Sequence, residues 1–193
     1  RTLLAENLAR PSLWVMITDP WYETKRHIGG EQAHPDWKIL NVQAGPDVDY
    51  LGNCTDLSQF ADASIEAIYA AHVFEHLDYQ TELQQTLAEC HRVLAPAGEL
   101  MVSVPNLGVL CQLFAAEGLT EVQRFRIMRM IFGGQTDAYD FHKVGLIEDF
   151  LVNYFRQSGF ARWRRAEEFS VFDDGSSLRV GEHLISLNMI ATK

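Results

Sequence analysis

The sequence is short of cysteine and of long apolar runs, and each shortage excludes a class of protein. Its three cysteines, Cys54, Cys90 and Cys111, are odd in number and lack metal-ligand spacing, so neither a disulfide framework nor a cysteine metal site is predicted. They favour a reducing compartment, the cytoplasm, and free, buried thiols. No stretch approaches the roughly 20 apolar residues that a membrane span needs, so no membrane partner is expected.

Basic residues are also few, 16 against 26 acidic ones, which gives a formal net charge of −10. A field of that sign repels phosphate backbones, so nucleic acid is not expected as a partner. A local basic cluster, Arg162, Arg164 and Arg165, is interpreted as the solvated face of a strand. The hydrophobic content of 47% and the length suit one domain over residues 1–193. The chain starts at Arg1 rather than at methionine, as an excised domain or a processed chain would.

Apolar runs alternate with helical patterns along the chain. The runs predicted to be strands are 26–30, 38–42, 48–52, 66–71, 100–104, 163–171 and 184–191. Helices are predicted after Asp78, over 107–132 with a break near Gly118, and over 146–158, whereas residues 1–20 are expected to form an N-terminal arm. The alternation predicts an α/β fold with a doubly wound, mostly parallel sheet.

Two features modify that sheet. The last two strands are joined by the turn-rich residues 173–177 and are predicted to pair antiparallel at one edge. Between Gly30 and Lys38 only seven residues intervene, and Pro35 is among them. A parallel crossover ordinarily takes about a dozen residues or more, so its usual helix does not fit. A shortened first strand–helix unit is therefore expected.

Residues 56–105 carry a set of motifs in a fixed order. They are Asp56-Leu57, Phe60-Ala-Asp-Ala-Ser64, a strand, His72-Val-Phe-Glu-His76, Glu89-Cys-His-Arg-Val-Leu94, Pro96-Ala-Gly98 and Ser103-Val-Pro105. In order and spacing they resemble the central half of the class I methyltransferases, which use S-adenosylmethionine. The resemblance implies the Rossmann-like methyltransferase fold, this cofactor and methyl transfer.

A narrower resemblance involves the shortened start and residues 132–137, 140–142 and 185–188. Together they look like a subgroup of methyltransferase-like proteins found among polysaccharide-assembly enzymes. The acceptor is accordingly expected to be a hydroxyl group of a small molecule or a glycan.

The resemblance also implies a donor site, carried over position by position. Its residues are Gly29 and Gly30 under the methionine part, Gln43 at the ribose, Asp56 and Leu57 at the adenine, and Ala71 and His72 beside the sulfonium. Glycine is expected because a Cβ would block the approach of the backbone to the ligand. Gln43 stands where the family has a carboxylate, and it can bond a hydroxyl group only without charge assistance.

Candidate bases for the acceptor hydroxyl are His142, His72 and Asp140. The segment 131–145 is a possible active-site insertion, because ligands of open α/β sheets bind beyond the carboxyl ends of the strands. Asp140 and His142 are two residues apart and could jointly deprotonate a hydroxyl group. A helix-capping turn with a surface histidine explains the same residues equally well.

Two other functions stay open. The departures at Gln43 and between Gly30 and Lys38 favour a binding or scaffold domain that kept the fold and lost the donor site. The run 72–76 also spells the His-x-x-Glu-His pattern of inverted zinc peptidases, in which two histidines bind zinc and Glu activates water. The methyltransferase motifs on both sides of it disfavour that interpretation, so no metal site is predicted.

Overall fold

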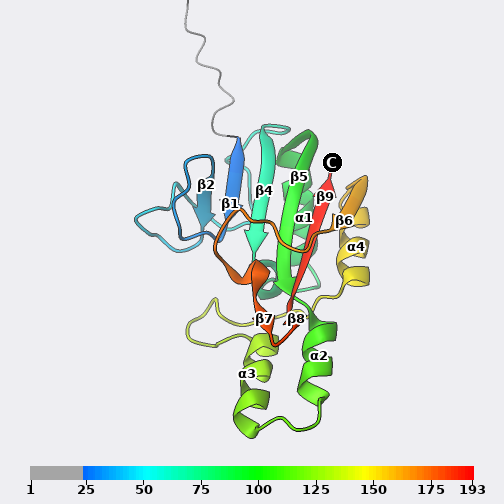
Figure 1. Cartoon of the computed structure of the whole chain (residues 1–193). Helices are drawn as coiled ribbons and strands as arrows, with labels where there is room; N and C mark the ends of the chain where they lie inside the picture. The colour runs from blue at the N-terminus through cyan, green and yellow to red at the C-terminus, as the bar shows by residue number, and fades with distance from the viewer. Residues whose placement is uncertain (1–23) are drawn as a thin grey trace, which may run out of the picture.

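The computed structural model describes residues 24–193, so the arm predicted over residues 1–20 lies outside the described part of the chain. That part is built on a seven-stranded sheet with the order β3-β2-β1-β4-β5-β9-β6 (Figure 1). The strands are β1 Lys25–Ile28, β2 Lys38–Asn41, β3 Tyr50–Leu51, β4 Ile65–Ala71, β5 Leu94–Pro105, β6 Arg162–Arg165 and β9 Ser186–Thr192. β1 to β5 pair in parallel, and β9 runs antiparallel between β5 and β6. The predicted mostly parallel sheet with an antiparallel pair at one edge is confirmed.

The helices of the described residues follow the predicted pattern. They are α1 Glu82–Val93, α2 Leu107–Ala115, α3 Glu121–Phe132 and α4 Glu148–Gln157, with short 3-10 helices η1 Phe74–His76 and η2 Gly175–Ser177 and a small hairpin of β7 Arg179–Val180 and β8 His183–Leu184. Asp78 accepts hydrogen bonds from the backbone N–H groups of Gln80 and Thr81, at 2.9 and 2.7 Å, and so organises the start of α1. α2 and α3 project beyond the carboxyl ends of the parallel strands (Figure 1). None of these helices is long and apolar enough to cross a bilayer.

The two faces of the sheet are covered differently. α1 and α4 pack together on one face, over the main apolar core. Within the described residues, the other face is crossed by the segment 166–178, which contains no α-helix (Figure 1). Its Phe172 packs on the rings of His27 and Tyr69, with centroids 4.0 and 5.0 Å apart. Packed aromatic rings cover this face of the sheet, whereas helices cover the other face.

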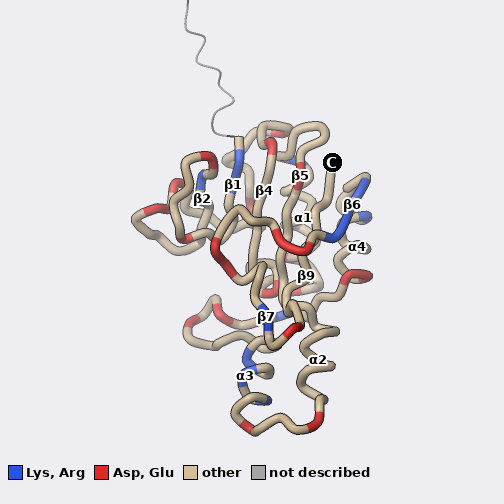
Figure 2. Tube along the Cα trace, viewed as in Figure 1, with Lys and Arg blue, Asp and Glu red and all other residues tan. Residues whose placement is uncertain are grey.

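The edge strand β6 is shorter than predicted. The sequence indicates a strand over 163–171, but β6 ends at Arg165 because the chain then leaves the edge and crosses the sheet. Arg162, Arg164 and Arg165 are exposed, as predicted for a solvated strand face. Figure 2 shows basic residues along β6. Arg165 forms an exposed ion pair with Glu148 at 3.4 Å.

Residues 31–37 join β1 to β2 without a helix, as predicted. Gly29 begins this connection with a φ of 76°, and its N–H donates to the carbonyl of Leu40 at 2.8 Å. A side chain is disfavoured in that left-handed conformation, which accounts for glycine. Trp37 ends the connection and is buried against Tyr69, with ring centroids 6.0 Å apart.

The thiols are free, as predicted, but they are not all buried. Cys54 and Cys90 lie in the core. Cys111 is exposed on α2, so the expectation of a buried thiol is wrong at that position. α2 buries little of its surface because it projects from the sheet (Figure 1).

Candidate active site

The carboxyl ends of β1, β2 and β4 meet at one edge of the sheet and border a cavity of about 410 Å³, the edge cavity. Its lining includes Gly29, Glu31, Gln43, Asn53, His72 and His76. Trp37 does not fill it, because that ring lies on the sheet face beside Tyr69 and Phe172. The cavity is therefore open where ligands of α/β sheets bind.

The structure brings some of the expected donor-site residues together and separates others. Gly29, Gln43 and His72 line the edge cavity, whereas Gly30 and Ala71 lie just outside its lining. The two glycines have reasons within the protein. A Cβ on Gly29 would lie 2.4 Å from the side chain of Val73, and one on Gly30 would lie 2.4 Å from His27. Packing against these neighbours, together with positive φ at Gly29, suffices to require glycine.

Asp56 and Leu57 are not at the edge cavity, contrary to expectation. Leu57 is buried in the core, and its N–H donates to the Glu89 carboxylate at 3.0 Å, which ties this loop to α1. Asp56 is exposed and borders a shallow hollow beside Arg92. Asn53 and Cys54 occupy the place in the lining where these residues were expected.

His72 is held by partners on both ring nitrogens. Nδ1 forms an ion pair with Oε1 of Glu75 at 3.3 Å, and Nε2 lies 3.1 Å from the hydroxyl of Ser186. That hydroxyl donates to the carbonyl of Gly175 at 2.7 Å, so it accepts from Nε2. Burial by itself lowers the pKa of His72, but the Glu75 carboxylate outweighs it and the net shift is upward. Both ring nitrogens of His72 are thus occupied by protein partners, so neither is free to accept a substrate proton.

Asp140 organises a turn. Its carboxylate accepts from the backbone N–H groups of Gly134 and Thr136 and from the Thr136 hydroxyl, at 3.1, 3.3 and 2.8 Å. The hydrogen bond from the Thr136 hydroxyl, more than the others, holds the pKa of Asp140 below its usual range. A Cβ on Gly133 would lie 2.4 Å from the Asp140 carbonyl oxygen. The carboxylate of Asp140 therefore holds together the turn over residues 134–140.

The turn delivers His142 to the side of His76, and these two imidazoles form what we call the histidine wall. Their ring centroids are 4.9 Å apart. Nε2 of His142 lies 4.0 Å from Oε1 of Glu75, which is 2% exposed beneath both rings. His142 is thus partnered by Glu75 rather than by Asp140. Burial lowers the pKa of His142 and the Glu75 charge offsets only part of that effect, so its imidazole is neutral near pH 7.

The histidine wall separates two hollows. His76 lines the edge cavity, and His142 lines a mainly apolar hollow of about 450 Å³ between α2, α3 and residues 142–145. Sequence reasoning missed this grouping. The run 72–76 gave the signal for Glu75 and His76, but the partner comes from 66 residues further along than His76.

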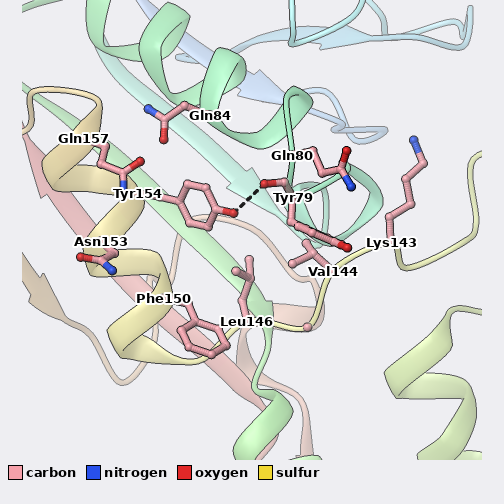
Figure 3. A pocket seen from close by; sticks show the side chains of 11 residues that line it. Tyr79, Gln80, Gln84, Lys143, Val144, Leu146, Phe150, Asn153, Tyr154 and Gln157 are labelled. Atoms are coloured by element: carbon pink, nitrogen blue, oxygen red, sulfur yellow. Dashed lines mark hydrogen bonds between the residues drawn. The ribbon is translucent and has the colours of Figure 1, made fainter.

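A third hollow, of about 620 Å³, lies between α1 and α4 (Figure 3). Its lining combines side-chain amides with aromatic rings: Gln80, Gln84, Asn153, Gln157, Tyr79, Phe150 and Tyr154. The hydroxyl of Tyr154 donates to the carbonyl of Tyr79 at 2.9 Å, and Oε1 of Gln84 is buried without a partner. Lys143 borders all three hollows.

Residues 18–102 match the family model described as a methyltransferase domain. A malonyl-[acyl-carrier protein] O-methyltransferase of Coxiella burnetii is 32% identical over 112 residues, which cover 57% of this chain and 34% of the relative. The chain thus spans about a third of the length of that curated relative.

Solved structures show the same architecture at low sequence identity. An S-adenosylmethionine-dependent methyltransferase from Archaeoglobus fulgidus is similar with a TM-score of 0.57 at 14% identity, over 91% of this chain and 90% of that one. The methyltransferase CalH, in complex with S-adenosylhomocysteine, is similar with a TM-score of 0.51 at 13% identity, over 89% and 51%. The chain therefore has the Rossmann-like methyltransferase fold, and residues 18–102 match the sequence model of a methyltransferase domain.

Proposed function

We propose that the chain is an S-adenosylmethionine-dependent methyltransferase that modifies a hydroxyl group of a small molecule or a glycan. The supporting observation is the open edge cavity at the carboxyl ends of β1, β2 and β4. Its volume of about 410 Å³ lies within the range of ligand pockets. A methyltransferase-fold domain that had lost its donor site would have no reason to keep this space open.

The residues of the edge cavity fit the cofactor. The amides of Gln43 and Asn53 suit ribose hydroxyl groups and adenine nitrogens, and the Glu31 carboxylate suits an ammonium group. In the described residues no helix lies between β1 and β2. Side chains rather than a helix N-terminus would therefore contact the cofactor there.

The chemistry needs alignment and one proton acceptor. When bound, S-adenosylmethionine supplies an electrophilic methyl group, and transfer depends mainly on positioning of the nucleophile. We assign the proton of the acceptor hydroxyl to Nε2 of His142, which is neutral and faces Glu75. Glu75 then stabilises the imidazolium. His72 fixes Glu75 and Asp140 shapes the turn, so both act as positioning residues. Unchanged turnover in His142→Gln would rule out this base.

The hollow in Figure 3, which shares Lys143 with the apolar hollow that His142 lines, suits the part of a hydroxylated acceptor that lies away from the reacting oxygen. Side-chain amides donate and accept hydrogen bonds, and the exposed ring of Tyr79 offers an apolar face for stacking. The Coxiella relative is likewise named as an O-methyltransferase, on a malonyl-acyl-carrier protein. We propose the same accepting atom, oxygen, for this chain.

Calorimetric titration with S-adenosylmethionine and S-adenosylhomocysteine tests the proposal. We expect micromolar binding of both, and loss of binding in Gln43→Trp, because an indole would fill the edge cavity. Gln112→Trp, on the exposed surface of α2, is the matched control and should bind as the wild type does. Silence of the wild type up to millimolar ligand would favour a scaffold domain.

A further inference from the structure

We infer that Glu75, His76 and His142 form a binding site for a divalent transition-metal ion. One ligand atom from each side chain lies within 4.8 Å of the other two. Glu75 and His76 are adjacent in η1, and His142 arrives from the segment after α3. Two hydrogen bonds fix this juxtaposition, from the N–H groups of Lys143 and Val144 to the carbonyl of Glu75, at 2.7 and 3.3 Å.

The buried carboxylate of Glu75 points to a cation. Its side chain is 2% exposed, and neither oxygen has a hydrogen bond of ordinary geometry. The contact of His72 Nδ1 with Oε1 at 3.3 Å leaves Oε2 without a partner. Burying a carboxylate is costly unless it is paired, and a metal ion between the carboxylate and Nε2 of His142, which lies 4.0 Å from Oε1, would complete its surroundings.

The two imidazoles are oriented as metal ligands are. Nδ1 of His76 lies 3.2 Å from the carbonyl oxygen of Phe141, so an N–H there donates and Nε2 keeps its lone pair. The ring of His142 contacts the carbonyl of Ile131, while its Nε2 faces Glu75. Carbonyl partners on the second nitrogen are the usual outer contacts of metal-bound histidines, because they fix tautomer and ring orientation.

The donor set defines the class of ion. Two imidazole nitrogens and one carboxylate oxygen suit Zn²⁺ and other first-row divalent ions. Ligand atoms around a tetrahedral zinc ion lie about 3.4 Å apart, so a small closing of these side chains completes the site. The arrangement differs from the zinc-peptidase pattern, because Glu75 is a ligand and His72 is withheld by Glu75 and Ser186.

Three protein ligands leave one coordination position open, and the histidine wall lies between the edge cavity and the apolar hollow. This step alone rests on the proposed function. If that function holds, the acceptor oxygen binds at the open coordination position. In the metal-loaded protein Nε2 of His142 would be a ligand rather than the base, and the cation would lower the pKa of the acceptor hydroxyl, which would lose its proton to solvent; in the metal-free protein His142 stays the base. Metal binding itself requires no S-adenosylmethionine, so it is tested separately.

The test is calorimetric titration of the demetallated full chain with Zn²⁺ alone, together with the visible spectrum of the Co²⁺-loaded protein. We expect one equivalent bound and a tetrahedral Co²⁺ signature. Glu75→Gln and His76→Gln should each weaken binding at least as much as the roughly 10- to 100-fold that loss of an outer partner costs. Both substitutions keep side-chain size, and circular dichroism would verify the fold.

Two controls address other metal-binding groups. His183→Ala removes an exposed histidine on β8, and Cys111→Ser removes the exposed thiol beside the apolar hollow. Both should keep wild-type affinity. Absence of Zn²⁺ uptake by the wild type, or equal weakening in a control variant, would overturn the site. Because the S-adenosylmethionine titration is run without metal, its failure and the failure of the metal site are distinguishable.

Discussion

His27 is a titratable side chain that is buried among aromatic rings. It lies on β1 between the rings of Phe172 and Tyr69, and its Nδ1 has no hydrogen-bond partner. Desolvation lowers its pKa from 6.5 to about 4, and the charge of Asp174 offsets part of that shift. Between about pH 4 and pH 6.5, His27 is therefore neutral in the folded protein and protonated in the unfolded chain.

This linkage predicts a loss of stability in acid that a single substitution removes. The contribution of neutral His27 is fully present above pH 6.5 and declines as the pH falls toward about 4. At about pH 5 the loss is on the order of 2 kcal/mol. We expect the free energy of unfolding, measured in urea, to fall by about 2 kcal/mol less on acidification to about pH 5 in His27→Phe than in the wild type. Phenylalanine fills the same aromatic site and does not titrate. Equal acid sensitivity of the two proteins would contradict the assignment.

Single residues also mark where sequence reasoning reached its limit. The sequence located Gln43 and His72 at the carboxyl edge, because strand ends can be recognised from the pattern. It did not reveal that Ser186 and Glu75 occupy both nitrogens of His72. Ser186 lies 114 residues from His72, and a partner at that separation is set by packing, which a local pattern does not encode.

At the scale of elements, the segment 133–142 acts as a preformed arm that presents His142. Gly133 has a φ of 87°, and an added Cβ would lie 2.4 Å from the Asp140 carbonyl oxygen. The N–H of His142 donates to the carbonyl of Phe132 at 3.2 Å, which returns the arm to the end of α3. The position of the histidine wall thus depends on a glycine that touches no cavity of the active site.

Gly133→Ala is expected to loosen this arm. A side chain at φ 87° and ψ 167°, a region almost confined to glycine, costs on the order of 1–3 kcal/mol, and the collision adds to it. We expect amide hydrogen exchange to show reduced protection of His142 and Gln135, whose N–H groups are bonded within the arm.

Gly118→Ala is the matched control. Gly118 has a φ of 79°, but an added Cβ would meet nothing within 4 Å. It shares the positive φ without the collision, so exchange in the arm should stay at the wild-type level. Equal loss of protection in both variants would show that the arm is not held by the fit around Gly133.

Elements were predictable to different degrees for a physical reason. Strands β1, β2, β4 and β5 and helix α1 show local periodicity, and the sequence places all of them. The segment 166–178 has apolar residues that pack across the sheet face, which resembles strand patterning in a linear sequence. Its path depends on an uncovered sheet face, and the short connection before β2 creates that face.

At the scale of the whole molecule, the net charge of −10 sets a field that the edge cavity shares. Figure 2 shows acidic residues spread over both ends of the sheet. Four acidic residues, Glu31, Glu82, Asp137 and Asp140, line the edge cavity, and Lys143 is the one lysine or arginine among the described residues of that lining, which also holds His72 and His76. A cationic ligand is thus favoured there over a neutral one of the same shape.

S-adenosylmethionine and S-adenosylhomocysteine provide that comparison, because they differ by one methyl group and the sulfonium charge. Raising the salt concentration from about 0.01 M to about 1 M shortens the Debye length from about 30 Å to about 3 Å. We expect calorimetry to show a larger loss of affinity for the sulfonium than for the neutral thioether. Glu31→Gln should narrow the difference, since it removes a charge from the lining itself. Equal salt dependence of the two ligands would mean that the acidic field does not reach the bound donor, and selection between substrate and product would then rest on contacts alone.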